Sequence, residues 1–564
     1  MDFLKTKHVD DLNTESAHSY HPRPSFKRDL FLSLNGRWDL AITREGEDAV
    51  YDRTVIVPFA PEAPLSGIGE RIPLGAVLHY RRQVDVPEEM TGKRILLHFG
   101  AVDQECEVFI SGERIGENKG GYLPFSFDVT EYAKAGSFTL EVTSRDTLDV
   151  KYPYGKQTDT PHGMWYTPVS GIWQTVWLEA VPKENAVEYI KITPFDTGVK
   201  IRVSGGAPTK EIIIEDGKSI FFEGDECIIE PDDLVRWTPE TPKLYYFNLK
   251  SGEDEIHSYF AVRTVGTVIG DDGIPRLALN GKPYLYNGLL DQGYYPDGLF
   301  MPLAADGYLD DIRLAKSLGF NMLRKHIKIE PDVFYYLCDK EGIAVFQDMV
   351  NNGDYSFLRD TALPTIGFKG RRDKGLHKDP EGRRIFEETM LKTAELLYNH
   401  PSVVYYTIFN EGWGQFSSDE MYGKLKDADG TRTIDSTSGW FKRKRSDVDS
   451  RHVYFKRIKA KRPTDKPLVI SEFGGYSFRA EGHLFSERNY GYRLFKERED
   501  FEKGFLNLFE NEVAPLVDLG ASAFVYTQLS DVEEETNGLV TYDRAVVKVD
   551  TEKCADVMMG IFKK

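Results

Sequence analysis

The stretch Val403-Val-Tyr-Tyr-Thr-Ile-Phe-Asn-Glu411 is a run of β-branched and aromatic residues that ends in an asparagine and a glutamate. Such a run is typical of a buried parallel strand whose polar end emerges where the chain turns. A second short apolar run, residues 467–470, leads into Ser471-Glu472. In a (β/α)8 barrel the catalytic residues sit at the carboxyl ends of the strands. The two runs therefore favour a barrel with one glutamate at each of two strand ends.

The rest of the C-terminal half shows the alternating strand and helix pattern of the same barrel. From about residue 269, strand-like runs alternate with segments of helical spacing, as parallel α/β folds require. The order of the strands places Glu411 on the fourth and Glu472 on the seventh. The eight predicted strands, the number that closes such a barrel, lie at 284–288, 320–324, 343–348, 403–409, 431–435, 451–455, 467–470 and 521–526.

The N-terminal half predicts β domains. Short alternating strands separated by Gly, Pro and Asp turns predict a jelly-roll-like β-sandwich over residues 1–182. Residues 183–268 hold a smaller set of short strands, which suggests an immunoglobulin-like sandwich. The predicted fold is therefore multidomain, with these two β-sandwiches followed by a (β/α)8 TIM barrel over residues 269–564.

Composition excludes several function classes. The 564 residues suggest three or four domains, and the net charge of -19 disfavours nucleic acid and anionic membranes as partners. No apolar run has the length of a signal peptide or a membrane span, so we expect a cytoplasmic enzyme. No CxxC or Cys/His cluster joins the four cysteines, which predicts neither a zinc site nor a disulfide framework. The cysteines are Cys106, Cys227, Cys338 and Cys554.

Two carboxylates at strand ends can hydrolyse a sugar acetal with retention of configuration. One carboxyl group must be protonated to release the aglycone, and the other must be ionised to attack the anomeric carbon. A single glutamate at a strand end is more often an ion-pair or capping residue, but two such strands in one predicted barrel favour catalysis. The reaction would require the pKa of Glu411 to be raised while Glu472 stays ionised, and the charge of Glu472 would supply that rise.

Motifs in all three predicted domains resemble glycoside hydrolase family 2, the group of β-galactosidases, β-glucuronidases and β-mannosidases. The resemblance covers nearly the whole chain, in the family's domain order. The motifs are Leu34-Asn-Gly-Arg-Trp38, Gly171-Ile-Trp-Gln-Thr-Val-Trp-Leu178, Leu279-Asn-Gly-Lys282, Asn399-His-Pro-Ser-Val403, Asn410-Glu411 and Ser471-Glu-Phe-Gly474.

The resemblance implies roles for five residues. Glu411 is similar to the family's acid/base, and Glu472 is similar to its nucleophile. Asn410 would bind the sugar 2-hydroxyl, an interaction that strengthens in the transition state. Tyr454 is similar in position to the tyrosine that holds the nucleophile, and His326 matches the family histidine at the second strand end.

Further substrate-binding candidates lie at other strand ends. Asp348 ends the third strand and could bind a hydroxyl or orient Arg324, and Asp291 follows the first strand. Trp413, Trp440 and Trp165 could stack on a sugar, although ordinary packing explains them equally well.

Two positions depart from the family pattern. Its usual His-Tyr-Pro reads His326-Ile-Lys328, and the tryptophan expected before Asn-Glu is replaced by Tyr406. Both glutamates survive, so the departures weaken only the transfer of substrate identity.

The predicted function is retaining exo-β-glycosidase, most like a β-galactosidase, acting on an oligosaccharide or glycoside. A β-glucuronidase, or another family 2 enzyme for a charged or unusual sugar, is the alternative. It is disfavoured because the glucuronidase Asn-x-Lys motif has no lysine in the comparable stretch 535–544. A non-catalytic carbohydrate-binding protein is the rival of another class. No metal or other cofactor is expected. Family members often form dimers or tetramers, so a homo-oligomer is compatible with the resemblance.

One basic segment stands out in this acidic chain. Residues 441–462 hold ten Lys or Arg against two Asp, and they flank the fifth and sixth strands. A solvated surface loop is the simpler interpretation. The functional alternative is an electropositive rim that attracts a charged glycan or aglycone.

Overall fold

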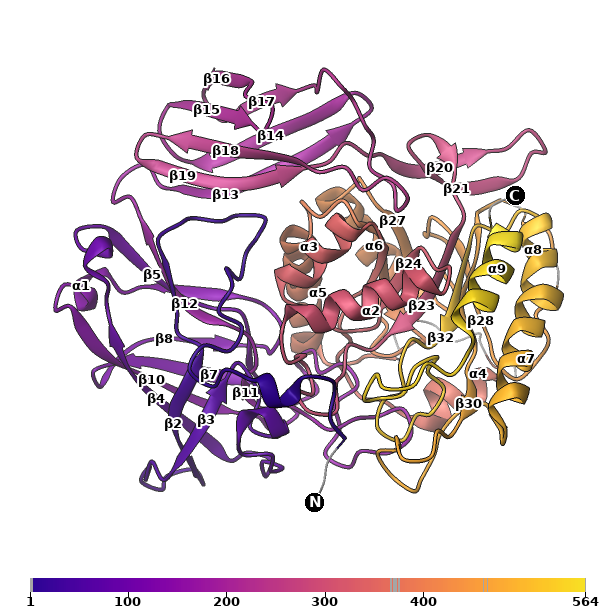
Figure 1. Cartoon of the computed structure of the whole chain (residues 1–564), viewed down its shortest axis with the longest axis horizontal. Coiled ribbons are helices and arrows are strands. Elements are labelled where there is room, and N and C mark those ends of the chain that lie inside the picture. Colours follow the sequence, from indigo (N-terminus) through magenta and orange to yellow (C-terminus); the bar gives the residue numbers. More distant parts are fainter. Residues whose placement is uncertain are drawn as a thin grey trace.

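The computed structural model describes residues 4–365, 368, 373, 376–459, 461–463 and 465–562. Two β-sandwiches pack against a barrel that is surrounded by helices (Figure 1). The predicted fold class is therefore confirmed. No helix among the described residues is long and apolar enough to span a membrane.

The first sandwich consists of a six-stranded and a four-stranded sheet. Residues alternate between buried and exposed along its strands, so that each sheet turns one apolar face inward. The larger sheet has the order β3 (Arg53–Val57), β2 (Gly36–Thr43), β4 (Val77–Asp85), β10 (Ser137–Arg145), β7 (Glu105–Ile110) and β8 (Glu113–Lys119). The smaller sheet has the order β1 (Phe31–Ser33), β12 (Val176–Val181), β5 (Arg94–Phe99) and β9 (Phe125–Asp128).

The second sandwich has the size of an immunoglobulin-like domain. Its core is aliphatic, with Ile190, Ile201, Ile212 and Leu249 all buried. One sheet has the order β13 (Val187–Phe195), β14 (Gly198–Gly205) and β17 (Glu226–Ile229). The other has the order β16 (Ser219–Glu223), β15 (Thr209–Ile214), β18 (Tyr245–Ser251) and β19 (Asp254–Phe260).

All eight predicted barrel strands are present and run parallel. Their order in the sheet is β27, β26, β25, β24, β23, β32, β29, β28, and the hydroxyls of Ser438 and Ser450, 3.3 Å apart, join its two outer strands. In chain order the strands are β23 (Tyr286–Asp291), β24 (Met322–Lys325), β25 (Ala344–Asp348), β26 (Val403–Asn410), β27 (Thr433–Ser438), β28 (Asp449–Val453), β29 (Leu468–Gly474) and β32 (Ala523–Thr527).

Helices cover the outside of the barrel, and their apolar faces form the largest buried cluster with the strands. In α5, Asp379 accepts a hydrogen bond from the backbone of Glu381 and Pro380 occupies the first turn, which is a favourable start for a helix. The main helices are α2 (Ala305–Ser317), α3 (Asp332–Glu341), α5 (Pro380–Leu396), α6 (Ser418–Ala428), α7 (Arg498–Leu508) and α9 (Thr551–Phe562).

A cavity of about 700 Å³ lies where the two sandwiches meet the barrel. Its lining residues, among those that the structure describes, include Trp177, Tyr122 and Glu395 but none of the predicted site residues. The predicted site residues therefore lie outside this cavity.

A buried histidine fastens the second sandwich to the barrel. His400, which lies just before β26, has Nδ1 2.7 Å from Asp339 Oδ2 and Nε2 2.9 Å from Asp332 Oδ1. Tyr259 of the second sandwich donates to the same oxygen of Asp339 at 2.7 Å. Burial alone would lower the pKa of His400, but the two carboxylates raise it to about 10.

We expect His400 to make the stability of the fold pH-dependent. Its folded pKa is raised above the unfolded value of about 6.5, so its contribution is complete below that value and is lost as the pH rises through about 10. The variant His400→Gln should lose about 3 kcal/mol or more at pH 6, because it leaves two buried carboxylates without their cation. The melting temperatures of the two proteins should converge between pH 8 and pH 10.5. A difference that stays constant over this range would contradict the assignment.

Candidate active site

The two predicted catalytic glutamates lie together at the carboxyl end of the barrel. Glu411 directly follows β26, and Glu472 lies near the end of β29. Both are buried, with 8% and 4% of their surface exposed. One oxygen of each carboxylate and one ring nitrogen of His452 all lie within 4.8 Å of one another. Carboxylate oxygens no more than 4.8 Å apart fit the retaining arrangement, with carboxyl groups roughly 5–5.5 Å apart, better than the roughly 6.5–9.5 Å of inverting enzymes.

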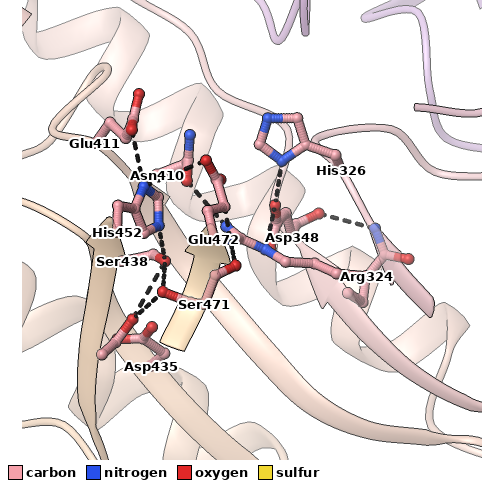
Figure 2. A network of polar contacts seen from close by, with 12 residues as sticks. Arg324, His326, Asp348, Asn410, Glu411, Asp435, Ser438, His452, Ser471 and Glu472 are labelled. Carbon is pink, nitrogen blue, oxygen red and sulfur yellow. Dashed lines mark hydrogen bonds and ion pairs between the residues drawn. The ribbon is translucent and has the colours of Figure 1, made fainter. Parts of the chain in front are cut away.

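Arg324 is the centre of the polar network at this end of the barrel (Figure 2). From β24, its Nη1 donates to Glu472 Oε1 at 3.0 Å and to the carbonyl of Ser471 at 2.8 Å. Its Nη2 donates to Asn410 Oδ1 at 2.9 Å, and its Nε donates to Asp348 at 3.0 Å. Arg324, predicted as a substrate-binding residue, thus has all three nitrogens bound to protein acceptors, and direct contact with sugar stays a prediction.

Asp348 orients the residues that were predicted around it. It binds Arg324, and its Oδ2 lies 2.7 Å from His326 Nδ1. Burial and the nearby charge of Lys156 lower the pKa of His326 to about 3, so its imidazole is neutral. With Nδ1–H donating to Asp348, Nε2 is the ring nitrogen left to accept a hydrogen bond.

Asn410 and Tyr454 both belong to the network around Glu472, and their predicted roles stay predictions. The side-chain oxygen of Asn410 accepts a hydrogen bond from Arg324, while its Nδ2 is buried without a hydrogen-bond partner among the described residues. That amide group is thus available to a sugar hydroxyl. Tyr454 donates to Glu472 Oε2 at 2.5 Å and stacks on Tyr492, with the ring centroids 4.0 Å apart.

His452 is a site residue that sequence reasoning missed. Its Nδ1 lies 2.8 Å from Glu411 Oε1 and 3.3 Å from Glu472 Oε2, so it bridges the two carboxylates. Its Nε2 lies 2.8 Å from the hydroxyl of Ser438. The signal was present in the sequence, because a residue two positions before Tyr454 on a strand points to the same side of the sheet.

Neighbouring groups have opposite effects on the pKa of Glu472. Burial raises the pKa of this carboxyl group, His452 and Arg324 lower it, and Glu411 raises it again. Together these effects raise the pKa of Glu472 above its ordinary value. The nucleophile candidate therefore depends on His452 and Arg324, which both lower its pKa, to be ionised near neutral pH.

The predicted aromatic residues pack against one another near the glutamates. The ring centres of Trp413 and Trp165 lie 5.4 Å apart, and those of Trp413 and His326 lie 6.4 Å apart. Trp440 lies 5.7 Å from the ring of His452. All three tryptophans are therefore near the site, and Trp165 brings the first sandwich into it.

Asp291 belongs to a separate buried ion-pair network. Its Oδ2 lies 2.6 Å from Lys325 Nζ, and Lys325 also contacts Glu330 at 2.9 Å. Burial alone would raise the pKa of Asp291, but the charge and hydrogen bond of Lys325, together with the backbone N–H of Gly293 and the charge of Arg544, lower it. The structure does not bring Asp291 into contact with either catalytic glutamate.

The basic segment 441–462 is partly neutralised by acidic neighbours. Arg451 lies 2.5 Å from Asp449, which Lys442 also contacts, and Arg443 pairs with Asp373. This pattern favours the surface-loop interpretation over an electropositive rim.

The bridging trio could also hold a cation. Glu411, Glu472 and His452 offer two carboxylate oxygens and one imidazole nitrogen, a donor set that Zn²⁺ accepts in proteins. A cation held there would occupy both carboxylates, so it would block a reaction that needs them free.

Two family profiles match the chain. One, described as "Glycosyl hydrolases family 2, sugar binding domain", covers residues 71–182. The other, described as "Glycosyl hydrolases family 2, TIM barrel domain", covers residues 276–550.

Curated relatives agree with the profiles. A β-galactosidase of Thermoanaerobacter pseudethanolicus is 32% identical over 300 residues, which cover 48% of this chain and 39% of that protein. A β-galactosidase of Vibrio vulnificus is 25% identical over 72% of this chain and 39% of its own length. The chain thus spans well under half the length of these relatives.

Solved structures share the fold over nearly the full length. A β-glucuronidase of an uncultured Clostridium has a TM-score of 0.74 at 18% identity, with 95% of this chain and 99% of that chain covered. A β-galacturonidase from Eisenbergiella tayi has a TM-score of 0.70 at 18% identity, with 95% and 98% covered.

We expect the substitution His452→Asn to shift the pH dependence of the enzyme. His452 favours the anion of Glu472, so without it the pKa of Glu472 should rise further. The acidic limb of the kcat/KM profile should then move to higher pH, and kcat/KM at its optimum should fall by up to about 100-fold, because the two carboxylates lose their common support.

The matched control is His483→Asn. His483 binds Asp543, away from the two glutamates, so this variant should keep the wild-type pH profile. If His452→Asn lowers activity equally at every pH, the bridging role is wrong and the histidine is only structural.

Proposed function

Because the chain belongs to glycoside hydrolase family 2, we propose that it is a retaining exo-β-glycosidase that releases a terminal galactose-like sugar. The observation that carries this proposal is the pairing of Glu411 and Glu472 across the barrel end. The surroundings of the two glutamates differ, because Arg324 and Tyr454 donate hydrogen bonds to Glu472 and not to Glu411. That asymmetry supports different roles for the two carboxylates.

In the first step, an ionised oxygen of Glu472 forms a bond to the anomeric carbon. The bond from that carbon to the leaving oxygen breaks, and Glu411 gives its proton to this oxygen. Arg324 Nη1 and the hydroxyl of Tyr454 each bind one oxygen of Glu472, so the carboxylate is held in one orientation. Holding the nucleophile in this way reduces the entropic part of the barrier.

In the second step, Glu411 takes a proton from water, and the water oxygen attacks the anomeric carbon. The ester bond to Glu472 breaks, and the sugar leaves with its β configuration retained. The amide of Asn410, whose Nδ2 has no partner among the described residues, would bind the sugar 2-hydroxyl, and this hydrogen bond strengthens as the neighbouring anomeric carbon gains positive charge in both transition states.

The galactose-like sugar is supported by the names of the relatives, since both are described as β-galactosidases. The solved neighbours are described as a β-glucuronidase and a β-galacturonidase, and at 18% identity they support the fold alone. A non-catalytic binding protein would have no need of two carboxylates held in this asymmetric way.

Turnover of nitrophenyl β-glycosides tests the proposal. The panel comprises the β-galactoside, glucuronide, mannoside and glucoside and the α-L-arabinopyranoside. We expect turnover of at least one sugar, and Glu472→Gln should abolish it because no nucleophile remains. Glu411→Ala should lower kcat by about 10²–10⁴-fold on leaving groups that need a proton.

The two variants also distinguish the roles of the glutamates. Azide should rescue Glu411→Ala and yield the β-glycosyl azide, because azide replaces water on the covalent intermediate. Rescue of Glu472→Gln by the same route, or turnover that persists in Glu472→Gln, would show that the roles are assigned wrongly. Silence of the wild type on every sugar would contradict the proposed activity on simple glycosides.

A further inference from the structure

Lys156 of the first sandwich is a buried lysine without an acidic partner. Only 7% of its surface is exposed. Among the described residues, its ammonium group makes no hydrogen bond and no ion pair, and its contacts are the faces of two aromatic rings. Its Nζ lies 5.6 Å from the ring centre of Tyr166 and 5.8 Å from that of Trp413.

The other buried lysines show how unusual this is. Lys325 and Lys548 each have a carboxylate oxygen at 2.6 Å, and Lys328 has one at 2.8 Å. Lys210 donates to a backbone carbonyl at 2.9 Å. An ammonium group in a mostly buried residue has little water around it, and ring contacts replace only part of the interaction with an opposite charge. An anion bound at Lys156 would supply that opposite charge.

Lys156 stands on the same side of the site as His326 and Trp413. Its charge is close enough to His326 to disfavour protonation of that imidazole. Trp413 follows the proposed acid/base by two residues, and its ring lies 6.4 Å from that of His326. The ammonium group is therefore near Trp413 and His326, two of the predicted substrate-binding residues.

Nearby carboxylates are already engaged. Asp348 binds Arg324 and His326. Glu535 accepts from the hydroxyl of Tyr166 and lies 3.4 Å from Gln528 Nε2. Neither carboxylate forms an ion pair with Lys156, so the charge of the lysine is left for a ligand.

Two further buried donors belong to residues that contact Lys156 or its loop. The indole Nε1 of Trp413 and the side-chain amide of Asn351 have no hydrogen-bond partner among the described residues. The backbone carbonyl of Asn351 accepts from the N–H of Tyr154 at 3.1 Å, which ties it to the loop that carries Lys156. Tyr154 and Trp413 also belong to one packed cluster. An ammonium group with neighbouring N–H donors is the chemistry that binds a carboxylate.

We propose that Lys156 binds a carboxylate on C5 of the sugar, so that the preferred substrate is a galactose-like uronide rather than the neutral galactoside. This inference rests on the proposed glycosidase function and specifies its substrate class. A sulfate ester on the same ring would offer similar chemistry. Both groups carry one negative charge, and the carboxylate is favoured because its carbon is bonded directly to C5 of the ring, which holds it in a fixed position.

The test compares kcat/KM for nitrophenyl β-galacturonide, β-galactoside and β-galactoside 6-sulfate. The wild type should prefer the galacturonide. In Lys156→Met, the ratio of galacturonide to galactoside should fall by about 10- to 100-fold, the factor that loss of a hydrogen bond to a charged group produces. Lys156→Arg keeps the charge and should retain most of the preference.

The control variant is Lys191→Met, which removes another lysine that lies over a ring, 4.0 Å from the centre of Tyr398 in a different part of the molecule. It should leave the ratio at the wild-type value. A measurement without turnover accompanies the kinetics: galacturonate should bind Glu472→Gln more tightly than galactose does, and adding Lys156→Met should remove the difference.

The outcomes separate this inference from the proposed function. If the wild type prefers the galactoside and Lys156→Met leaves the ratio unchanged, the inference is overturned while the glycosidase stands. A preference for the 6-sulfate over the galacturonide overturns the carboxylate assignment. If no glycoside is turned over and neither sugar binds, the proposed function itself fails.

Discussion

The active site depends on one buried guanidinium group. Arg324 has only 1% of its surface exposed, and its nitrogens bind groups on three other barrel strands, β25, β26 and β29. A buried guanidinium group is stable only when its N–H donors have acceptors. Loss of one acceptor would therefore destabilise the whole network. Because Arg324 binds both Glu472 and Asn410, it fixes the nucleophile relative to the amide that is proposed to bind the sugar. His326 is oriented through Asp348 in the same network.

The first sandwich is part of the site as well as a scaffold. Its segment around Trp165 and Tyr166 reaches the barrel, where the backbone N–H of Thr167 donates to Glu533 at 2.8 Å and Tyr166 contacts Glu535. Lys156 arrives on the same segment. Substrate selection can therefore change in the β domain while the catalytic pair in the barrel stays the same, which is a physical route to several specificities on one fold.

Features that depend on one stretch of sequence could be predicted, whereas contacts between distant stretches were missed. The eight strands and both glutamates were accessible, because a buried parallel strand is a continuous apolar run with its functional residue at one end. The neighbours of those glutamates depend on which strands meet, so the sequence did not show that Arg324 binds Glu472. His452 could have been found from strand alternation. Lys156 could not, because it lies in another domain, whereas the glucuronidase Asn-x-Lys motif corresponds to residues 535–544.

The central claim is that Glu472 forms a covalent bond to the sugar, and direct trapping tests it. A 2-deoxy-2-fluoro-β-glycosyl fluoride of the preferred sugar slows both steps by destabilising their positively charged transition states, while its reactive leaving group keeps the first step faster than the second. Mass spectrometry of the digested protein should then find one sugar on the peptide that holds Glu472, and none in Glu472→Gln. A label on another residue, or hydrolysis to the α-configured product with no label, would contradict the account.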